Sequence, residues 1–103
     1  MRVISIKALR DFWLRYPAAR LALQAWLNEV QQADWAQPSD IKAKFGNASV
    51  LKNRRVVFNI KGNDFRLVAA LAYNTGVVFV KFIGTHKAYD AIDAETVEPT
   101  WLQ

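Results

Sequence analysis

The chain has 103 residues, of which 52% are hydrophobic, so it is long enough for one packed core and too apolar for a disordered tail. It contains no cysteine, which excludes disulfide bonds and thiolate metal sites. Its apolar stretches are no longer than a strand, and its first residues lack the pattern of a signal peptide. We therefore expect one domain over residues 1–103, cytoplasmic and not associated with a membrane.

The net charge of +5 is distributed unevenly along the chain. Residues 42–87 carry nine Lys or Arg and one acid, a balance of +8, whereas the rest of the chain has a balance of −3. A block of one sign concentrates a polyanion near it and speeds its approach. Charge alone leaves two interpretations open: a surface for nucleic acid, or a basic face that is merely solvated.

The N-terminal third predicts a strand followed by two helices. Residues 2–6 alternate enough for a short strand, and from Leu9 to Tyr16 the apolar residues recur with helical spacing. Pro17 ends this helix and suits the first turn of a second one, which continues to about residue 33. Because the break between them is short, the two helices should form an antiparallel hairpin.

The second half predicts several adjacent strands. Pro38 to Lys44 could form a single helical turn, and Gly46-Asn47 is a turn signal. The connections at 61–64 and 74–76 contain residues that accept positive φ, as tight hairpins require. The expected strands cover about 50–52, 56–61, 65–71 and 77–83, and a last short helix is expected over about 86–92.

These elements predict an α+β fold. Consecutive strands joined by hairpins form an antiparallel sheet, so two N-terminal helices should pack on one face of a small, mainly antiparallel sheet with a short C-terminal helix. This arrangement leaves the other face of the sheet free for a ligand. The segment 95–103 has no clear pattern, and Trp101 within it is expected to dock on the body of the protein or on a partner.

Strand alternation identifies candidate residues on that other face. Val56 and Phe58 point to the core, so Arg55, Asn59 and Lys61 should point away from it. On the next strand, an arginine interrupts an otherwise apolar run, and a charge there must be paired or reach solvent. This residue is Arg66, which could pair with an acid from the helices or with Asp64, or could bind a phosphate.

Polar residues also cluster where the last strand ends. His86 is the only histidine, and its imidazole can accept or donate a proton near neutral pH, but it could equally lie in a helical turn capped by Thr85. Tyr89 could be a buried anchor, a proton donor or a platform for a base. With one histidine and no cysteine, a metal site is the less favoured interpretation.

Other enzymatic signatures are absent from the sequence. It has no glycine-rich phosphate loop, no Gly-x-Ser-x-Gly motif and no Cys-His pair. Any reaction must therefore be one that basic, amide and imidazole groups can catalyse without a metal or cofactor. Cleavage of RNA by its own 2′-hydroxyl fits this limit, since it needs a group to take the proton, cations for the phosphorane and a donor for the leaving oxygen.

Two segments, 58–68 and 80–90, resemble the HigB toxins of bacterial toxin–antitoxin pairs, which belong to the RelE-like superfamily. The similarity extends to the connector at 34–42, and the Thr-His-x-x-Tyr-Asp ending at 85–90 is its most specific part. The resemblance implies a RelE-like fold and an mRNA endoribonuclease, or mRNA interferase, that cuts in the A site of the translating ribosome. It also implies neutralisation by a HigA-like helix-turn-helix antitoxin.

The same resemblance implies roles for individual residues. Arg66 falls where RelE-like toxins place a phosphate-binding arginine, and Lys61 lies on the preceding strand, where relatives carry lysines. His86 occupies roughly the place of an arginine, and Tyr89 stands near the place of a tyrosine, so His86 or Lys87 would carry the proton. The expected catalytic residues are Arg66, His86, Tyr89 and Lys61, and the expected RNA-binding residues are Asn59, Asn63, Lys87, Arg55 and Lys81.

Two other functions remain open from the sequence. The chain could be a non-catalytic protein that binds RNA, the ribosome or an antitoxin. It could also be a toxin aimed at DNA gyrase, as ParE-like members of the superfamily are.

Overall fold

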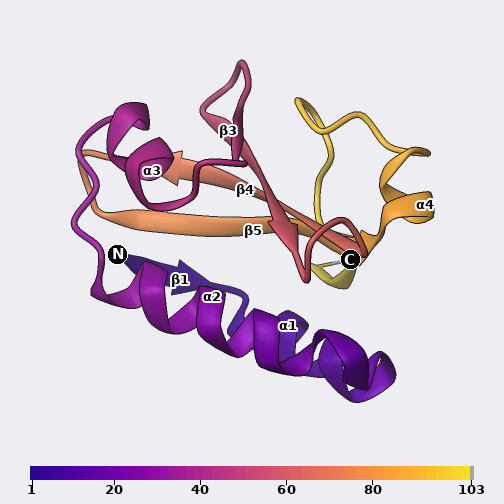
Figure 1. Ribbon diagram of the computed structural model, residues 1–103. Coiled ribbons are helices and arrows are strands. Elements are labelled where there is room, and N and C mark those ends of the chain that lie inside the picture. Colours follow the sequence, from indigo (N-terminus) through magenta and orange to yellow (C-terminus); the bar gives the residue numbers. More distant parts are fainter. Residues whose placement is uncertain (103) are drawn as a thin grey trace.

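The computed structural model describes residues 1–102, so Gln103, at the end of the segment 95–103, lies outside the described residues. The elements are β1 (Arg2–Ile4), α1 (Ile6–Arg15), the 3-10 turn η1 (Pro17–Ala19), α2 (Arg20–Gln32), α3 (Pro38–Lys44), β2 (Ser49–Val50), β3 (Arg55–Ile60), β4 (Phe65–Ala72), β5 (Val77–Thr85), α4 (His86–Tyr89) and the 3-10 turn η2 (Thr100–Leu102) (Figure 1). No helix among residues 1–102 has the length and apolar character needed to span a bilayer.

The strands form one five-stranded sheet in the order β1-β5-β4-β3-β2. Neighbouring strands are antiparallel, except that β1 pairs with β5 in parallel at one edge. The chain reverses at η1, so α1 and α2 run in opposite directions along one side of the sheet (Figure 1). The predicted α+β architecture, with its helical hairpin and mainly antiparallel sheet, is confirmed; the parallel edge strand is an addition to it.

The main core lies between the helices and one face of the sheet. Val56, Phe58 and Ile60 of β3 are buried in it, as the alternation predicts. The ring of Phe58 is surrounded by the rings of Trp26 and Phe45, with centroids 5.3 and 5.2 Å away. Aromatic contacts of this kind bury large apolar areas, and they fix α2 and α3 against the sheet.

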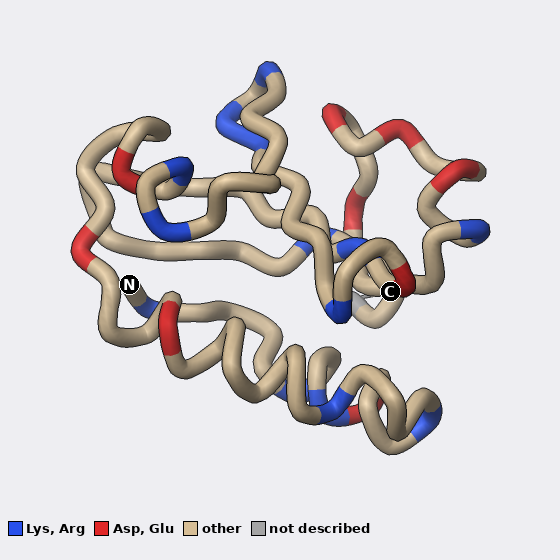
Figure 2. Tube along the Cα trace, viewed as in Figure 1, with Lys and Arg blue, Asp and Glu red and all other residues tan. Residues whose placement is uncertain are grey.

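The other face of the sheet is not free, and the prediction that it would be is wrong. After α4 the chain crosses this face as a strap, defined here as residues 90–101. Ala94 and Val97 of the strap pack with Val57 and Val68, the outward-facing residues of β3 and β4. Alternation predicts which side a residue faces, but it cannot predict that a later segment with no periodicity will cover that side. The strap carries several of the acids that follow α4 (Figure 2).

Several element boundaries also differ from expectation. β1 ends at Ile4 because Ser5 has a φ of 80°, which breaks the strand and lets α1 begin at Ile6. α4 ends at Tyr89 and not near residue 92, so the chain can turn and lay the strap on the sheet. β2 is confined to Ser49–Val50, because the chain turns tightly into β3 soon afterwards.

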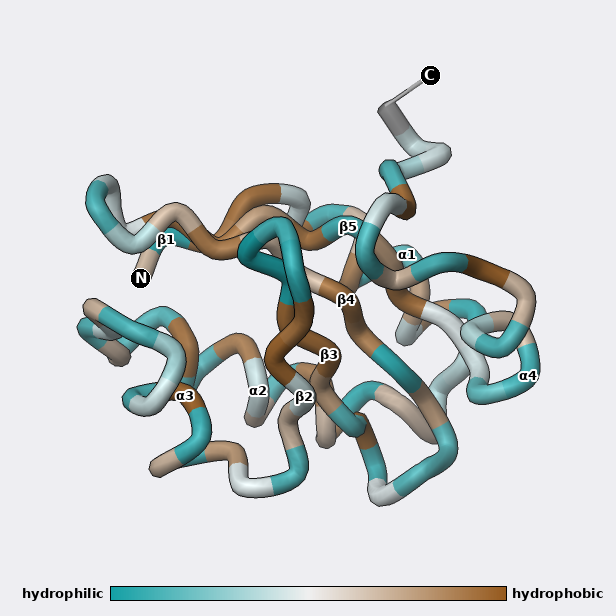
Figure 3. Tube along the Cα trace, turned by 90° about the horizontal axis from the view of Figure 1, so that it is seen from above, coloured by the Kyte–Doolittle hydropathy of each residue, from teal (hydrophilic) through white to brown (hydrophobic). Residues whose placement is uncertain are grey.

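The predicted hairpins are confirmed. The turn from β3 to β4 places Lys61 and Gly62 at φ values of 52° and 63°, and the turn from β4 to β5 places Gly76 at 69°. Glycine adopts this region without steric cost. Hydrophobic strands alternate with hydrophilic connections in Figure 3. Trp101 docks on the body of the protein, where its indole nitrogen donates a hydrogen bond of 3.2 Å to the Ser5 hydroxyl.

Candidate active site

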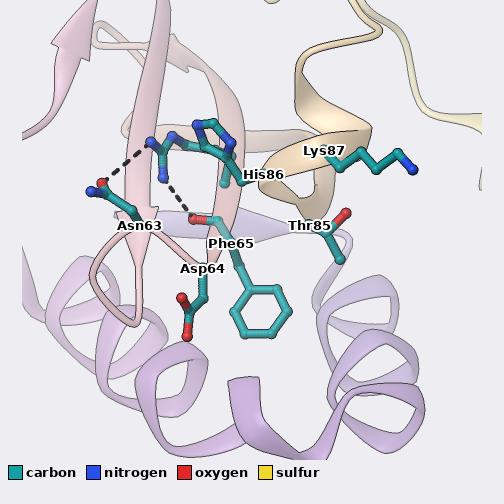
Figure 4. Close-up of a pocket in the computed structure, with 7 residues that line it drawn as sticks. Asn63, Asp64, Phe65, Thr85, His86 and Lys87 are labelled. Carbon is teal, nitrogen blue, oxygen red and sulfur yellow. Dashed lines mark hydrogen bonds between the residues drawn. The ribbon is translucent and has the colours of Figure 1, made fainter.

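The β3–β4 hairpin and the end of β5 enclose an open pocket of about 520 Å³. Strands β4 and β5 bring the walls of the pocket together. Phe65 of β4 pairs with Thr85 of β5, and the Asp64 carbonyl accepts a 3.1 Å hydrogen bond from the His86 amide. The pocket is lined by Asn63, Asp64, Phe65, Arg66, Thr85, His86 and Lys87 (Figure 4). Arg66 and His86, which are distant in sequence, therefore share one pocket.

Arg66 is one of the cations that line this pocket, and it makes no ion pair among residues 1–102. Its guanidinium donates hydrogen bonds of 3.3 Å to the Asn63 side chain and 3.4 Å to the Phe65 carbonyl (Figure 4). Both acceptors are neutral, so the positive charge stays available for an anion. The alternative in which Arg66 pairs with Asp64 or with an acid of the helices does not match the structure.

His86 is the first residue of α4 and is half-exposed at the pocket. Thr85 caps this helix, accepting a 3.1 Å hydrogen bond from the Ala88 amide, so the capping interpretation is confirmed. The cap does not prevent His86 from lining the pocket, because the hydrogen bond of Thr85 stabilises the helical turn from which the imidazole extends. His86 Nδ1 lies 3.6 Å from the Asp90 carboxylate, which is too long for a hydrogen bond.

Two other cations, Lys87 and Lys61, belong to the segments that form the pocket. Lys87 lines the pocket, and its ammonium points away from His86 in Figure 4. Lys61 is exposed in the hairpin turn and lies 3.9 Å from the Asp64 carboxylate, outside the pocket lining. Asn59 pairs with Arg66 in the sheet register but lines a separate hollow beside α3.

Two predicted RNA-binding residues are engaged elsewhere. Arg55 is only 6% exposed, and its guanidinium donates to the Val97 carbonyl and, at 2.9 Å, to the Glu98 carboxylate. Lys81 donates to the other oxygen of the same carboxylate at 2.9 Å. The expectation that Arg55 faces an open surface is therefore wrong, because the strap buries it.

The electrostatics of Glu98 follow from these contacts. The hydrogen bond from Lys81 and the charges of Lys81 and Arg55 hold the pKa of Glu98 below its ordinary value of 4.5. A carboxylate that stays ionised keeps both cations occupied and fixes the strap across the sheet. The sequence gives no signal for this role, because Glu98 lies in a segment without periodicity.

Tyr89 is not among the residues that line the pocket. Its ring is half-buried with the second cluster of apolar residues, and its centroid lies 6.4 Å from that of Phe82. The guanidinium carbon of Arg66 lies 5.8 Å from the centre of the Tyr89 ring. The alternative of a hydroxyl anchored to a backbone group does not match, since the hydroxyl makes no hydrogen bond within residues 1–102.

Sequence reasoning missed the role of Gly84. It is buried, it pairs with Arg66 across the sheet, and a Cβ added to it would lie 2.6 Å from the Phe82 ring. The missing side chain therefore makes room for Phe82 beneath Tyr89. A glycine inside a strand is the signal that could have indicated such a close approach.

Comparison with known proteins identifies the family of the chain. Residues 19–92 match the family described as HigB toxin, RelE-like toxic component of a toxin–antitoxin system. The mRNA interferase toxin HigB of Escherichia coli (strain K12) is 31% identical over 96 residues, which cover 91% of this chain and 92% of that protein. The mRNA interferase HigB of Escherichia coli O6:H1 is 28% identical over 94 residues, covering 89% of this chain and 91% of the relative. The chain therefore belongs to the HigB family of RelE-like toxins.

Proposed function

We propose that this protein is the toxin of a two-component toxin–antitoxin system and acts as an mRNA interferase. The observation that carries the proposal is the pocket in which Arg66, an arginine with no acidic partner among residues 1–102, lies together with the only histidine in the sequence. Relatives that align with about nine-tenths of the chain are named mRNA interferases, which supports the same activity.

In the proposed reaction, the 2′-hydroxyl of one nucleotide attacks the adjacent phosphorus and the bond to the 5′-oxygen breaks. The products are a 2′,3′-cyclic phosphate and a free 5′-hydroxyl. Arg66 binds the phosphate and stabilises the charge that develops on the phosphorane. His86 moves a proton at the 2′-oxygen or the 5′-oxygen, and this step requires no metal or cofactor.

Other residues bind the RNA around this centre. Asn63 and Lys87 line the pocket and are proposed to contact the phosphates on either side of the cleavage point. Lys61 is exposed in the neighbouring hairpin turn and can reach a further phosphate. We further propose that cleavage occurs in the ribosomal A site, in the cytoplasm, and that the neutralising partner is a HigA-like helix-turn-helix antitoxin.

The test is cleavage of a reporter mRNA in a translating extract. We expect Arg66→Ala to slow cleavage about 100-fold or more, as loss of a transition-state donor does. We expect a loss of about 100-fold or more for His86→Ala, the range of a general acid or base. The matched control is Arg10→Ala, which removes an exposed arginine of α1 outside the pocket and should cleave like the parent.

Three further measurements test the proposed chemistry and distinguish the mRNA interferase from the two alternative functions. A 2′-deoxy substitution at the cleaved nucleotide should abolish cleavage, because it removes the nucleophile. Intact mRNA despite tight binding would favour a non-catalytic binder. Inhibition of supercoiling in a gyrase assay, with mRNA left intact, would favour the ParE-like alternative.

A further inference from the structure

We propose that Tyr89 is a positioning residue for Arg66 and carries no proton itself. The inference rests on the proposed function, because it concerns how that reaction holds its phosphate-binding cation. The first observation is placement: the residues that line the pocket include Arg66 and His86 but not Tyr89. A residue outside this lining can act through a group that belongs to it, and Arg66 is the lining residue that Tyr89 contacts.

The second observation is the contact between Tyr89 and Arg66. The guanidinium carbon lies 5.8 Å from the ring centroid, within the range in which an aromatic face attracts a cation. The same guanidinium donates a hydrogen bond of 3.3 Å to the Asn63 amide oxygen. The Tyr89 ring and the Asn63 side chain thus restrain Arg66 from two elements, α4 and the β3–β4 hairpin.

The third observation is that the Tyr89 ring is itself supported from behind. Phe82 lies 6.4 Å from it, centroid to centroid, and Phe82 occupies the space that Gly84 leaves open. Both rings pack against the cluster of Val57, Val68 and Ala94, so the strap completes the support. The ring is therefore fixed before RNA arrives, and the position of Arg66 does not have to be established during binding.

The two possible roles of Tyr89 depend on different atoms, so two substitutions separate them. Tyr89→Phe removes only the hydroxyl and keeps the ring; Tyr89→Leu keeps an apolar side chain and removes the aromatic face. We expect single-turnover cleavage by Tyr89→Phe to stay within about twofold of the parent, and cleavage by Tyr89→Leu to fall about tenfold. Tyr73→Leu, the same change at a half-buried tyrosine of the main core, is the control for a purely structural effect.

A double-mutant cycle tests whether Tyr89 acts through Arg66. In an Arg66→Ala background, Tyr89→Leu should cause no further loss, because the group it positions is gone. A loss for Tyr89→Phe as large as that for Tyr89→Leu, or independent losses that multiply in the double variant, would overturn the proposal. The melting temperature of each variant is measured as well, so that a loss of cleavage caused by partial unfolding at the assay temperature is recognised.

A measurement without RNA keeps the inference separate from the proposed activity. In NMR spectra, the Arg66 side-chain protons should be shifted by the ring current of Tyr89, in the parent and in Tyr89→Phe but not in Tyr89→Leu. Shifts that are unchanged in Tyr89→Leu would contradict the contact, even in a protein that cleaves mRNA. A parent that shows the ring-current shift but leaves mRNA intact would support the contact and contradict the proposed function.

Discussion

Gly84 illustrates how one missing side chain organises the site. It is buried and pairs with Arg66 in the sheet, and the Phe82 ring lies only 2.6 Å from the position that a Cβ of residue 84 would take. The Phe82 ring in turn contacts Tyr89. A methyl group added at Gly84 would therefore displace Phe82, and through Phe82 and Tyr89 it would affect the position of Arg66, the cation that is proposed to bind the phosphate.

We predict that Gly84→Ala displaces Phe82, destabilises the protein by about 1–3 kcal/mol through overpacking, and slows mRNA cleavage severalfold. Gly46→Ala is the matched control, because a Cβ at Gly46 meets nothing within 4 Å. Urea unfolding and single-turnover cleavage of both variants measure the two effects. Equal behaviour of the two variants would show that Phe82 can move aside without consequence.

At the scale of elements, the strap is held by one carboxylate that joins two cations. Glu98 bonds to Arg55, whose side chain is buried, and to the partly exposed Lys81. Removing this carboxylate leaves the Arg55 charge buried with one carbonyl as its partner, and an uncompensated buried charge is costly. By contrast, Glu29 pairs with Lys44 at 3.2 Å where both side chains are exposed, and such pairs contribute little.

We predict that Glu98→Gln lowers the melting temperature at neutral pH more than Glu29→Gln does. The pKa of Glu98 is lowered in the folded state, so its stabilising contribution is present above its ordinary value of 4.5 and is lost as the pH falls through the lower folded value. The parent should therefore lose stability in that acidic window, and Glu98→Gln should lose less. Parallel pH profiles of melting temperature for the parent and Glu98→Gln would contradict this role of the strap.

The elements also show what the sequence could predict. The paired strands and hairpins of 55–85 follow from period-two patterns and turn residues, which act locally. The strap could not be predicted, because Ala94, Val97 and Glu98 have no period and are fixed only by contacts with distant strands. The β2–β3 turn is similar: Asn53 and Arg54 adopt positive φ values of 61° and 55°, although no glycine marks the position.

The candidate site depends on local and distant features in the same way. Arg66 and His86 were found because a charge in an apolar strand and a lone histidine at a strand exit are local features. Their convergence on one pocket depends on the pairing of β4 with β5. The position of Tyr89 outside the pocket lining depends on the packing of its ring with the second apolar cluster, which no spacing along the chain indicates.

At the scale of the whole molecule, the fold pairs part of the positive charge of residues 42–87 with an acid from later in the chain. Glu98 of the strap forms ion pairs with Arg55 and Lys81, two cations of this block. The cations that remain beside the pocket are Arg66 and Lys87, with Lys61 in the adjacent turn. We therefore expect the surface available to RNA to be smaller than the linear charge count suggests, because Arg55 and Lys81 are withdrawn from it.

This distribution predicts that substitutions of Lys81 and Lys87 change the salt dependence of RNA binding differently. Each phosphate contacted by a cation adds about 0.7 to the slope of log affinity against log salt for single-stranded nucleic acid. With an RNA made uncleavable by 2′-deoxy substitution, Lys87→Gln should reduce that slope by about 0.7, and Lys81→Gln should leave it unchanged. The physical reason is that the Lys81 ammonium already bonds to Glu98 at 2.9 Å, whereas Lys87 has no acidic partner within residues 1–102. An equal reduction for both variants would mean that the strap releases Lys81 when RNA binds, and that the basic surface extends beneath the strap to Arg55.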